Sequence, residues 1–579
     1  MFVLNNSLQE FRRRLASPDA ALPYALLGLL SGVITAGLII LFRLALEWPL
    51  AEFLPGDSAE NFEALPRYWH FALPFCGALL LGLILHFTPL SYRMTGIPHV
   101  IASLHHGRGR LPPGNLALQF GGGLIALLSG QSGGREGPAV HIGAAASSLF
   151  GLRMRLPNNS LRVMTACGTA AAIAASFNTP IAGVIFAMEV VMLEYTVTGF
   201  VPVILASVTA TTLSQAVFGD IVFLPAGDLN MNSLLELPFI ALLGISAGVL
   251  SGLFVSIQSR CLRLLNKPVL LRMLLAGLVT GLCATLAPQI LGIGYDSLQA
   301  AMDGSYSLQV LLLLLVLKLL ASAVSCGMGM PIGIIGPSLL IGAFAGALLG
   351  NVGVMLFPEL AADHSFYVLL GMAATMGAIL NAPLAALLAI IELTHNLNVV
   401  FPAMLAVIAA QLVHKEGFGL QSAHQTTLQA TQQSVRSDPL TLELLRTSVA
   451  ALMDRNLKHV VQHLPVADIP GLTEKPVRWL VITNQEGQQI VVHREHWFPL
   501  LNALQPEDET IDLLAILEHR RRTAAVDVTG TLWEALDAMN QAGLDTLFVS
   551  SSRQRRGPPD EGIITREALS DHYNLPIRF

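Results

Sequence analysis

Long apolar stretches separated by short polar ones occupy roughly the first three quarters of the chain. The first stretch runs from Leu22 to Leu46, and it follows a polar segment that carries the arginine run Arg12–Arg14. A stretch of this length exceeds the ~20 apolar residues that a membrane crossing needs. Arginines beside a crossing are typical of its cytoplasmic end. The pattern therefore predicts a first membrane helix, with residues 1–20 in the cytoplasm.

Many of the later apolar stretches begin at Gly or Pro, and several are shorter than a full crossing. They lie near Phe71–Phe87, Leu116–Leu128, Pro138–Phe150, Leu161–Phe177, Ile181–Leu193, Phe200–Phe218, Leu235–Ile257, Leu270–Leu291, Leu308–Ala323, Ile334–Leu349, Ser365–Leu380, Pro383–Leu393 and Val399–Val413. A bilayer tolerates broken or partial helices only inside protein or beside a water-filled cavity. The pattern therefore predicts an α-helical polytopic membrane protein of the transporter or channel type.

An internal repeat divides this apolar region into two halves. "GREGPAVHIGAAASSLFG" (Gly134–Gly151) aligns with "GIIGPSLLIGAFAGALLG" (Gly333–Gly350) at an offset of 199 residues. "FNTPIAGVIFAME" (Phe177–Glu189) aligns with "LNAPLAALLAIIE" (Leu380–Glu392) at an offset of 203 residues. We place the two repeats at about residues 70–220 and 235–425. Such duplications bring equivalent helix ends together near the membrane midplane, where transporters bind their substrates.

The last quarter of the chain has the alternation of a soluble α/β module. After a polar linker at residues 426–440, "WLVIT" at Trp479–Thr483 and "DTLFVS" at Asp545–Ser550 are expected to form strands. "TLWEALDAMNQAG" (Thr531–Gly543) predicts an amphipathic helix between a Thr cap and a Gly cap, and Gly562–Leu569 predicts a strand that leads into a helix. We therefore expect a transmembrane domain over residues 21–425 and a cytoplasmic domain over residues 441–579.

Composition supports this division and excludes some function classes. Hydrophobic residues make up 53% of the chain and charged residues 12%, against about 25% charged in soluble proteins. About 35 of the 72 charged residues follow Val435. The net charge of −6 gives no indication of nucleic-acid binding. The five cysteines form no CxxC pair and have no His at ligand spacing, so neither a disulfide nor a metal site is expected.

Two adjacent charges stand out in the middle of the apolar region. Between Gly114 and Gly151 the only formal charges are Arg135 and Glu136, in "GREGP". A proline in the first helical turn is pre-organised for a helix start, and a helix N-terminus carries unpaired N–H groups and a partial positive charge. Such an end is a site for an anion. The second repeat supplies "GIIGP" (Gly333–Pro337), and "TGIP" (Thr95–Pro98) is a third candidate.

These three loops, in this order, resemble the signature loops of the CLC family of chloride channels and chloride/proton antiporters. "FNTPIAGVIF" (Phe177–Phe186) and "NAPLAALLAIIELT" (Asn381–Thr394) extend the resemblance, which covers about residues 20–425. It implies a homodimer in the lipid bilayer, with one anion pathway per subunit built from two inverted repeats. For this chain it implies a bacterial inner (plasma) membrane protein with both termini in the cytoplasm, which transports chloride, with or without protons, and is not an enzyme.

Carried over residue by residue, Glu136 matches the gating glutamate of the family. A carboxylate there imitates the anion, and protonation or chloride displaces it from the site. The resemblance implies these anion-binding positions: Thr95, Gly96, Ile97, Arg135, Gly137, Ile334, Ile335 and Gln421. Arg135 is expected to be a structural or electrostatic partner near the pathway.

The sequence departs from the family pattern at four positions in or near the pathway. Ile335 and Gly336 replace the phenylalanine and alanine of the third loop, and Gln421 replaces the tyrosine that faces the central anion. Val190 occupies the position of the antiporters' inner, proton-carrying glutamate, as in the family's channels. Some antiporters lack that glutamate. Glu189 and Glu194 lie nearby as candidate substitutes, and a helix-capping or packing role is favoured for each. The sequence thus favours a passive or weakly proton-coupled chloride channel, with a proton-coupled antiporter as the alternative.

The tail resembles a pair of CBS domains, which are common in this family. Its second copy, Ala525–Tyr573, is the clearer one. CBS pairs that bind adenine nucleotides use a Thr followed three residues later by Asp, and here Thr565 is followed by Ala568. We therefore expect a regulatory or dimerising tail rather than a nucleotide site, and no resident cofactor.

Two readings from other classes remain. An intramembrane hydrolase could use Ser132 and His141, but the sequence shows no paired base and the reading gives the duplication no role. A membrane-anchored CBS sensor without transport is the other. A fluoride-selective relative is disfavoured because Pro138 and "TGIP" follow the chloride pattern.

Overall fold

A computed structural model describes residues 10–12, 14–16, 20–56, 60–106, 108–195, 197–219, 229–359, 361–433, 435, 439–473, 476–484, 488–503, 509–550 and 561–573. Most of the expected N-terminal segment, including Arg13, and part of the expected linker lie outside these residues. The chain divides into two compact units. The larger comprises Tyr24–Met154 and Leu161–Val435, and the smaller comprises Met1–Pro23, Arg155–Ser160 and Arg436–Phe579.

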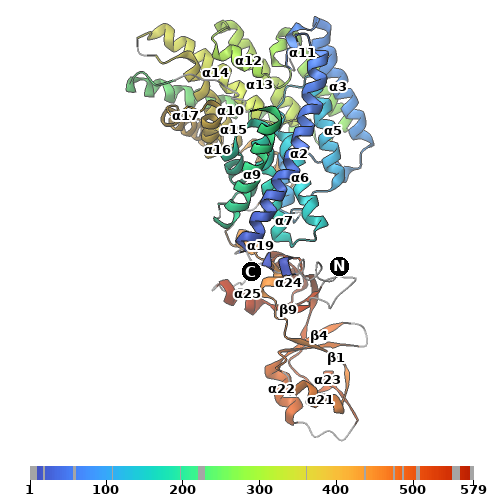
Figure 1. Ribbon diagram of the computed structural model, residues 1–579. Coiled ribbons are helices and arrows are strands. Elements are labelled where there is room, and N and C mark those ends of the chain that lie inside the picture. Colours follow the sequence, from blue (N-terminus) through green and yellow to red (C-terminus); the bar gives the residue numbers. More distant parts are fainter. Residues whose placement is uncertain are drawn as a thin grey trace. The chain divides into compact units, whose positions relative to one another are not determined.

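The apolar region is helical throughout its described length (Figure 1). Its helices are α2 (Ala21–Phe53), α3 (Arg67–Phe87), α4 (Gly96–His105), α5 (Pro113–Leu128), α6 (Glu136–Arg153), α7 (Asn158–Phe177), α8 (Pro180–Phe186), α9 (Val197–Phe218), α10 (Leu237–Leu262), α11 (Val269–Leu286), α12 (Tyr295–Met302), α13 (Leu308–Gly327), α14 (Ile335–Leu356), α15 (His364–Leu380), α16 (Pro383–Thr394), α17 (Val400–Leu412) and α18 (Ala423–Ala430). Short 3-10 turns lie at η1 (Phe62–Ala64), η2 (Leu90–Tyr92), η4 (Leu234–Glu236) and η5 (Pro288–Ile290), and π-helical turns at η3 (Ala187–Met192) and η6 (Val413–Gly417).

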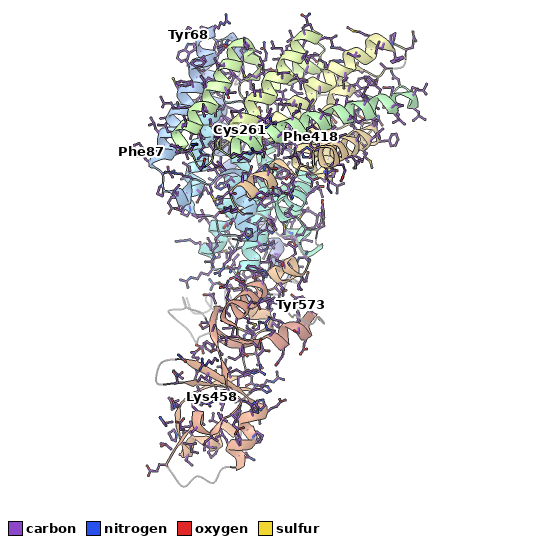
Figure 2. The ribbon with its side chains drawn as sticks, turned by 180° about the vertical axis from the view of Figure 1, so that it is seen from behind. Tyr68, Phe87, Cys261, Phe418, Lys458 and Tyr573 are labelled. Carbon is purple, nitrogen blue, oxygen red and sulfur yellow. The ribbon has the colours of Figure 1, made fainter. Side chains whose placement is uncertain are left out.

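Eight of the described helices are long and apolar enough to cross a membrane. Several expose large apolar side chains, as lipid-facing helices do. Figure 2 shows Tyr68 and Phe87 at opposite ends of α3, where they are 66% and 81% exposed. Aromatic side chains at both ends of a crossing are typical of the two membrane–water interfaces. The expected polytopic membrane architecture is confirmed.

The internal repeat reappears in the helix packing. A Cβ atom on Gly143 of α6 would lie 2.4 Å from the Gly168 carbonyl oxygen of α7. In the second repeat, a Cβ atom on Gly342 of α14 would lie 2.2 Å from the Gly371 carbonyl oxygen of α15. Glycine pairs of this kind let membrane helices approach closely. The two glycine pairs occupy equivalent positions in the two repeats, so the duplication predicted from sequence extends to the packing.

The smaller unit contains the strands. These are β1 (Leu457–Val461), β2 (His463–Pro465), β3 (Trp479–Thr483), β4 (Gln489–His493), β5 (Thr510–Asp512), β6 (Arg521–Arg522), β7 (Ala524–Asp527), β8 (Thr546–Ser550) and β9 (Gly562–Thr565). Its helices are α19 (Pro439–Arg446), α20 (Val449–Leu452), α21 (Ile469–Thr473), α22 (Arg494–Ala503), α23 (Leu513–Ile516), α24 (Leu532–Ala542) and α25 (Arg566–Tyr573), with a 3-10 turn at η7 (Val466–Asp468).

The strand pairing of this unit is itself duplicated. β1 pairs parallel with β3, and β3 pairs antiparallel with β4. In the same way, β7 pairs parallel with β8, and β8 pairs antiparallel with β9. The sheet orders are β1-β3-β4-β6, β2-β5 and β7-β8-β9. This repeated α/β topology is consistent with the expected CBS pair.

Candidate anion site where the two repeats meet

The "GREGP" and "GIIGP" loops are joined directly by backbone hydrogen bonds. Gly134 N donates to Gly333 O at 3.0 Å, and Gly333 N donates to Gly134 O at 2.7 Å. The two glycines thus form an isolated antiparallel bridge between loops that are 199 residues apart. The structure therefore brings together the two loops that the repeat identified from sequence.

Both loops lead into helices whose first turns point at this junction. α6 begins at Glu136 after Arg135, and α14 begins at Ile335 after Ile334. Neither of these N-terminal residues forms a side-chain cap hydrogen bond. Helix starts without caps leave N–H groups available to an anion.

Glu136 places its carboxylate at the second of these helix starts. The residue is fully buried. Gly336 N, in the first turn of α14, donates to Glu136 Oε1 at 3.0 Å. Glu136 Oε2 has no hydrogen-bond partner among the described residues. The carboxylate thus occupies the position that a bound anion would take at the α14 N-terminus.

Only glycine fits at three positions around this carboxylate, because a side chain at any of them would collide with the carboxylate or with the facing loop. A Cβ atom on Gly134 would lie 1.9 Å from Glu136 Oε2, and one on Gly333 would lie 2.2 Å from Oε1. A Cβ atom on Gly137 would lie 2.7 Å from the Gly333 Cα atom. The glycines of both motifs therefore create the space for the Glu136 side chain.

Arg135 turns away from this carboxylate towards other partners. Its Nη1 donates to Glu47 Oε1 at 2.9 Å, and its Nη2 donates to the Ser176 carbonyl oxygen at 2.7 Å. Glu47 also receives a bond from Arg43 Nε at 2.6 Å. These contacts favour the expected structural role of Arg135 over direct anion binding, since its guanidinium bridges α2 and the end of α7.

An acidic group lies in the loop between α2 and α3, near this arginine. Tyr295 N donates to Glu60 Oε2 at 2.5 Å. Burial and the neighbouring Asp296 carboxylate raise the pKa of Glu60 to about 7. The charge around Arg135 therefore depends on pH near neutrality.

The third loop, "TGIP", connects to the junction through a residue that sequence reasoning missed. Thr95 precedes α4, and Gly96 has φ +76°, which favours glycine. Gly96 N donates to Gln119 Oε1 at 2.6 Å, and Gln119 Nε2 donates to Pro331 O at 3.2 Å, two residues before Gly333. An amide side chain within the apolar stretch Leu116–Leu128 was the available signal. Gln119 thus ties the start of α4 to the "GIIGP" loop.

Ile97 and Gln421 differ in their surroundings. Ile97 is buried in the first turn of α4. Gln421 lies before α18 and is exposed, and its Oε1 accepts a bond from Gln429 Nε2 at 2.7 Å. No contact in the described residues brings Gln421 to Glu136. Its role in anion binding stays a prediction.

Val190 is buried in the π-helical turn η3. The preceding Glu189 is used for helix capping, as favoured above. Its carboxylate accepts bonds from Leu384 N at 3.3 Å and Ala385 N at 2.8 Å, at the start of α16. Neither residue therefore presents a free carboxylate at the position of the antiporters' inner glutamate.

The residues of the alternative hydrolase reading have separate partners. Ser132 Oγ bonds to Ser322 Oγ at 3.0 Å, and His141 Nε2 bonds to His99 Nδ1 at 2.9 Å. Within the described ranges no group of three or more His, Cys, Asp or Glu side chains has the geometry of a metal site. The structure gives no nucleophile–base pair from Ser132 and His141.

Known relatives have this fold. A cyanobacterial Cl−/H+ antiporter, described as slow, superposes with a TM-score of 0.61 at 23% identity, over 72% of this chain and 98% of its own. A eukaryotic CLC transporter superposes with a TM-score of 0.59 at 19% identity, over 94% and 97% of the two chains. At these identities the likeness establishes the fold alone.

Sequence comparison establishes the family. A putative chloride channel protein, ClcB-like, from Ralstonia nicotianae is 32% identical over 370 residues, 63% of this chain and 86% of its own. The H(+)/Cl(−) exchange transporter ClcA of Vibrio cholerae is 31% identical over 325 residues, 54% of this chain and 69% of its own. Residues 76–415 match the voltage gated chloride channel family. With three signature loops, two repeats and a matching fold, this chain belongs to the CLC family of voltage gated chloride channels and transporters.

Proposed function

We propose that this protein conducts chloride across the membrane under the control of Glu136, passively or with weak proton coupling. One observation carries the proposal: the buried Glu136 carboxylate accepts a hydrogen bond from Gly336 N at the N-terminus of α14. A carboxylate and a chloride ion compete for the same partial positive charge. Chloride can then enter only when the side chain leaves.

Protonation offers a second way to displace the carboxylate. A neutral carboxyl group loses its attraction to the helix dipole and bonds more weakly to the Gly336 N–H. Acid on the side that reaches Glu136 therefore favours the open state. This makes the transport rate depend on pH even where no proton crosses the membrane.

Weak coupling is favoured by the apolar Val190 at the inner-glutamate position and by an apolar cavity beside the proposed gate. A cavity of about 30 Å³ lies beside the first turns of α14, the helix whose Gly336 N bonds the Glu136 carboxylate. Its lining includes Ile335, which is next to Gly336, and Phe186, which is four residues before Val190. The lining consists mostly of Ile, Leu, Ala, Phe and Met, and Thr179 is its one polar side chain. A water molecule in a cavity needs two to four polar partners. A lining of this kind therefore holds few water molecules and gives protons no chain of water to cross.

A proton-coupled Cl−/H+ antiporter is the second candidate. The H(+)/Cl(−) exchange transporter of Vibrio cholerae, which is 31% identical, favours it. The two candidates differ in the reversal potential: passive conduction follows the chloride gradient alone, whereas an antiporter's reversal potential shifts with a pH gradient.

Three further features belong to the proposal. We place the protein in a bacterial inner membrane, with both termini cytoplasmic, as a homodimer with one pathway per subunit. We assign the tail a regulatory CBS-pair role. Ala568 N donates to Thr565 Oγ1 at 3.1 Å, so this threonine is occupied by its own helix start. That contact supports a tail without an adenine nucleotide.

The test is chloride efflux from liposomes that contain the purified protein. Wild-type protein is expected to release chloride, faster at low pH. Glu136→Gln, which imitates the protonated group, is expected to release chloride with little pH dependence. Glu52→Gln, at an exposed position of α2, is the matched control and should behave as wild type. No efflux from wild-type protein would overturn the transport proposal, and an unchanged pH profile in Glu136→Gln would overturn the gate assignment.

A further inference from the structure

Two histidines from different helices form a buried pair close to the anion site. His99 Nδ1 and His141 Nε2 lie 2.9 Å apart, and the rings stack with centroids 5.1 Å apart and planes 22° apart. A neutral imidazole has one donor and one acceptor nitrogen. One ring of the pair therefore donates to the other, and the bond has two equivalent tautomeric forms.

Both rings lie about one turn from the site residues of their own helices. His99 is four residues after Thr95 on α4, and His141 is five residues after Glu136 on α6. At a rise of about 1.5 Å per residue, each ring is attached roughly 6–8 Å along its helix from the proposed anion site. α4 also packs against η3, the turn that contains Val190. The pair thus lies near the proposed gate, and the far end of α4 reaches the turn that contains Val190, where His105 Nε2 bonds the Val191 carbonyl oxygen at 3.3 Å.

His141 is the more buried of the two histidines, and its Nδ1 atom is the ring nitrogen that is not bonded to His99. His141 is fully buried, and its Nδ1 has no hydrogen-bond partner among the described residues. His99 keeps some accessible surface. Leaving a buried polar atom unpaired costs about 1–3 kcal/mol. A side chain needed only to fill this space would avoid that cost, and a nitrogen that accepts and releases a proton explains it.

The surrounding elements bring few charges towards the pair. α6 carries Glu136 itself and Arg153, η3 carries Glu189, α18 carries His424 and α7 carries Arg162. α2, which bonds to α6 through Ser31 and Ser147, carries Arg43, Glu47 and Glu52. α4 carries His105, whose Nε2 is bonded to the Val191 carbonyl oxygen. α5 and α14, which also pack against α6, contain no charged residue. Among the described residues, none of these groups hydrogen-bonds to either ring, so the pair is a self-contained acid–base unit.

We propose that His99 and His141 form a proton-transfer dyad beside the anion pathway, in place of the inner glutamate that Val190 replaces. This rests on the proposed chloride transport by the same pathway. A proton binds the lone pair of His141 Nδ1, and the His141 Nε2 proton then crosses the 2.9 Å bond to His99 Nδ1. His99 releases its Nε2 proton in return. One proton enters and one leaves, and only N–H bonds change. Both rings are then in the other tautomer, so each ring must return to its first tautomer before a second proton crosses in the same direction, and the reverse sequence carries a proton the other way.

The test measures chloride and proton movement together in liposomes with a chloride gradient and no initial pH gradient. In wild-type protein, chloride efflux is expected to drive a slower proton movement in the opposite direction. His141→Gln and His99→Gln are each expected to lower the proton-to-chloride ratio about tenfold or more, with chloride efflux retained. The double variant should lose no more than either single variant, because a proton must pass both rings.

His70→Gln is the control, since His70 is buried on α3 and bonds the Phe62 carbonyl oxygen at 3.1 Å, away from α4 and α6. It should keep the wild-type ratio. If His141→Gln does not reconstitute, His99→Gln gives the same test at the less buried ring. Chloride efflux without proton movement in wild type, or an unchanged ratio in the His variants, would overturn the dyad alone. Absence of chloride efflux in wild type would overturn the proposed function instead.

Discussion

At the scale of single residues, the proposed gate depends on a very small volume that only the Glu136 carboxylate or an anion can occupy. The Glu136 carboxylate fits between Gly134 and Gly333 only because neither carries a side chain. The three atoms nearest to a Cβ on Gly134 all belong to the Glu136 side chain, whereas a Cβ on Gly333 would also meet backbone at Gly137 N. Gly134 is therefore the position where added volume acts on the gate with least disturbance to the loops.

Gly134→Ala is expected to expel the Glu136 side chain from the α14 N-terminus. The added methyl group would lie within 2.3 Å of three carboxyl atoms, and a rotatable side chain yields before backbone does. Chloride efflux should then rise at neutral pH and lose its pH dependence. The same result is expected for Glu136→Ala, a variant that lacks the carboxylate. The measurement is liposome efflux at two pH values. Gly121→Ala, where the Cβ meets no atom within 4 Å, is the control. If Gly134→Ala still raised chloride efflux in protein that already carries Glu136→Ala, this explanation would be wrong.

The sequence identified the motif residues of this site but not their long-range partners. "GREGP" and "GIIGP" predicted the helix starts and the central carboxylate, because those features depend on local glycine, proline and charge. Gln119 and the His99–His141 pair were missed as site residues, since their contacts join positions 23 and 42 residues apart. A side chain's partner across helices depends on packing, which local pattern does not contain.

At the scale of helices, the two repeats cap each other. Glu189 from the first repeat accepts bonds from the N-terminus of α16 in the second. Glu392 from the second repeat accepts bonds from Ile181 N at 2.8 Å and Ala182 N at 2.7 Å, at the start of α8 in the first. The two carboxylates are equivalent in the repeat alignment. Each half of the domain therefore completes a helix of the other.

Replacing either carboxylate should destabilise the transmembrane domain without closing the pathway. A carboxylate at a helix N-terminus contributes about 0.5–2 kcal/mol. Glu189→Gln and Glu392→Gln should each lower the thermal unfolding midpoint of the purified protein by similar amounts, and the double variant should lower it further. Chloride efflux at a permissive temperature should persist. Glu359→Gln, at an exposed position, should leave the midpoint unchanged. A lower unfolding midpoint for only one of the two single variants would contradict reciprocal capping.

The ends of helices were predicted best where the sequence contains recognisable capping residues. The helix expected between Thr531 and Gly543 is α24, with a Thr531–Glu534 capping box and Gly543 in the left-handed region. The stretch expected at Pro138–Phe150 is instead α6, Glu136–Arg153, because the apolar pattern omits the polar residues at both helix ends. Apolar periodicity locates a membrane helix, and its ends depend on backbone bonds made elsewhere.

At the scale of the whole molecule, one apolar face combines helices from both repeats. Exposed side chains on α8 and α9 include Ile181, Val201 and Ile204, and those on α16 and α17 include Leu384 and Phe401. Ile204 is 43% exposed and Phe401 59% exposed. A face to which both repeats contribute suits association with a second copy, as the homodimer proposal requires.

The paired change Ile204→Gln and Phe401→Gln should convert a dimer into monomers in mild detergent. A glutamine amide placed in an apolar contact between two copies has no hydrogen-bond partner there, which costs about 1–3 kcal/mol for each substitution. Light scattering after size exclusion measures the mass, and liposome efflux should persist because Glu136 and both loops belong to one chain. Leu312→Gln with Val316→Gln, on the exposed face of α13, is the matched control. Unchanged mass in the first variant would contradict this interface.

The Gly134–Gly333 bridge also sets the speed at which the protein can switch. Two backbone hydrogen bonds hold the repeats together beside Glu136, so the halves cannot swing apart there without breaking both. Opening is then a rotation of one buried side chain within a fixed scaffold, without the whole-domain movements that take microseconds to milliseconds. In the proposed mechanism, chloride flow therefore depends on how often the carboxylate is displaced, and not on a slow rearrangement of the repeats.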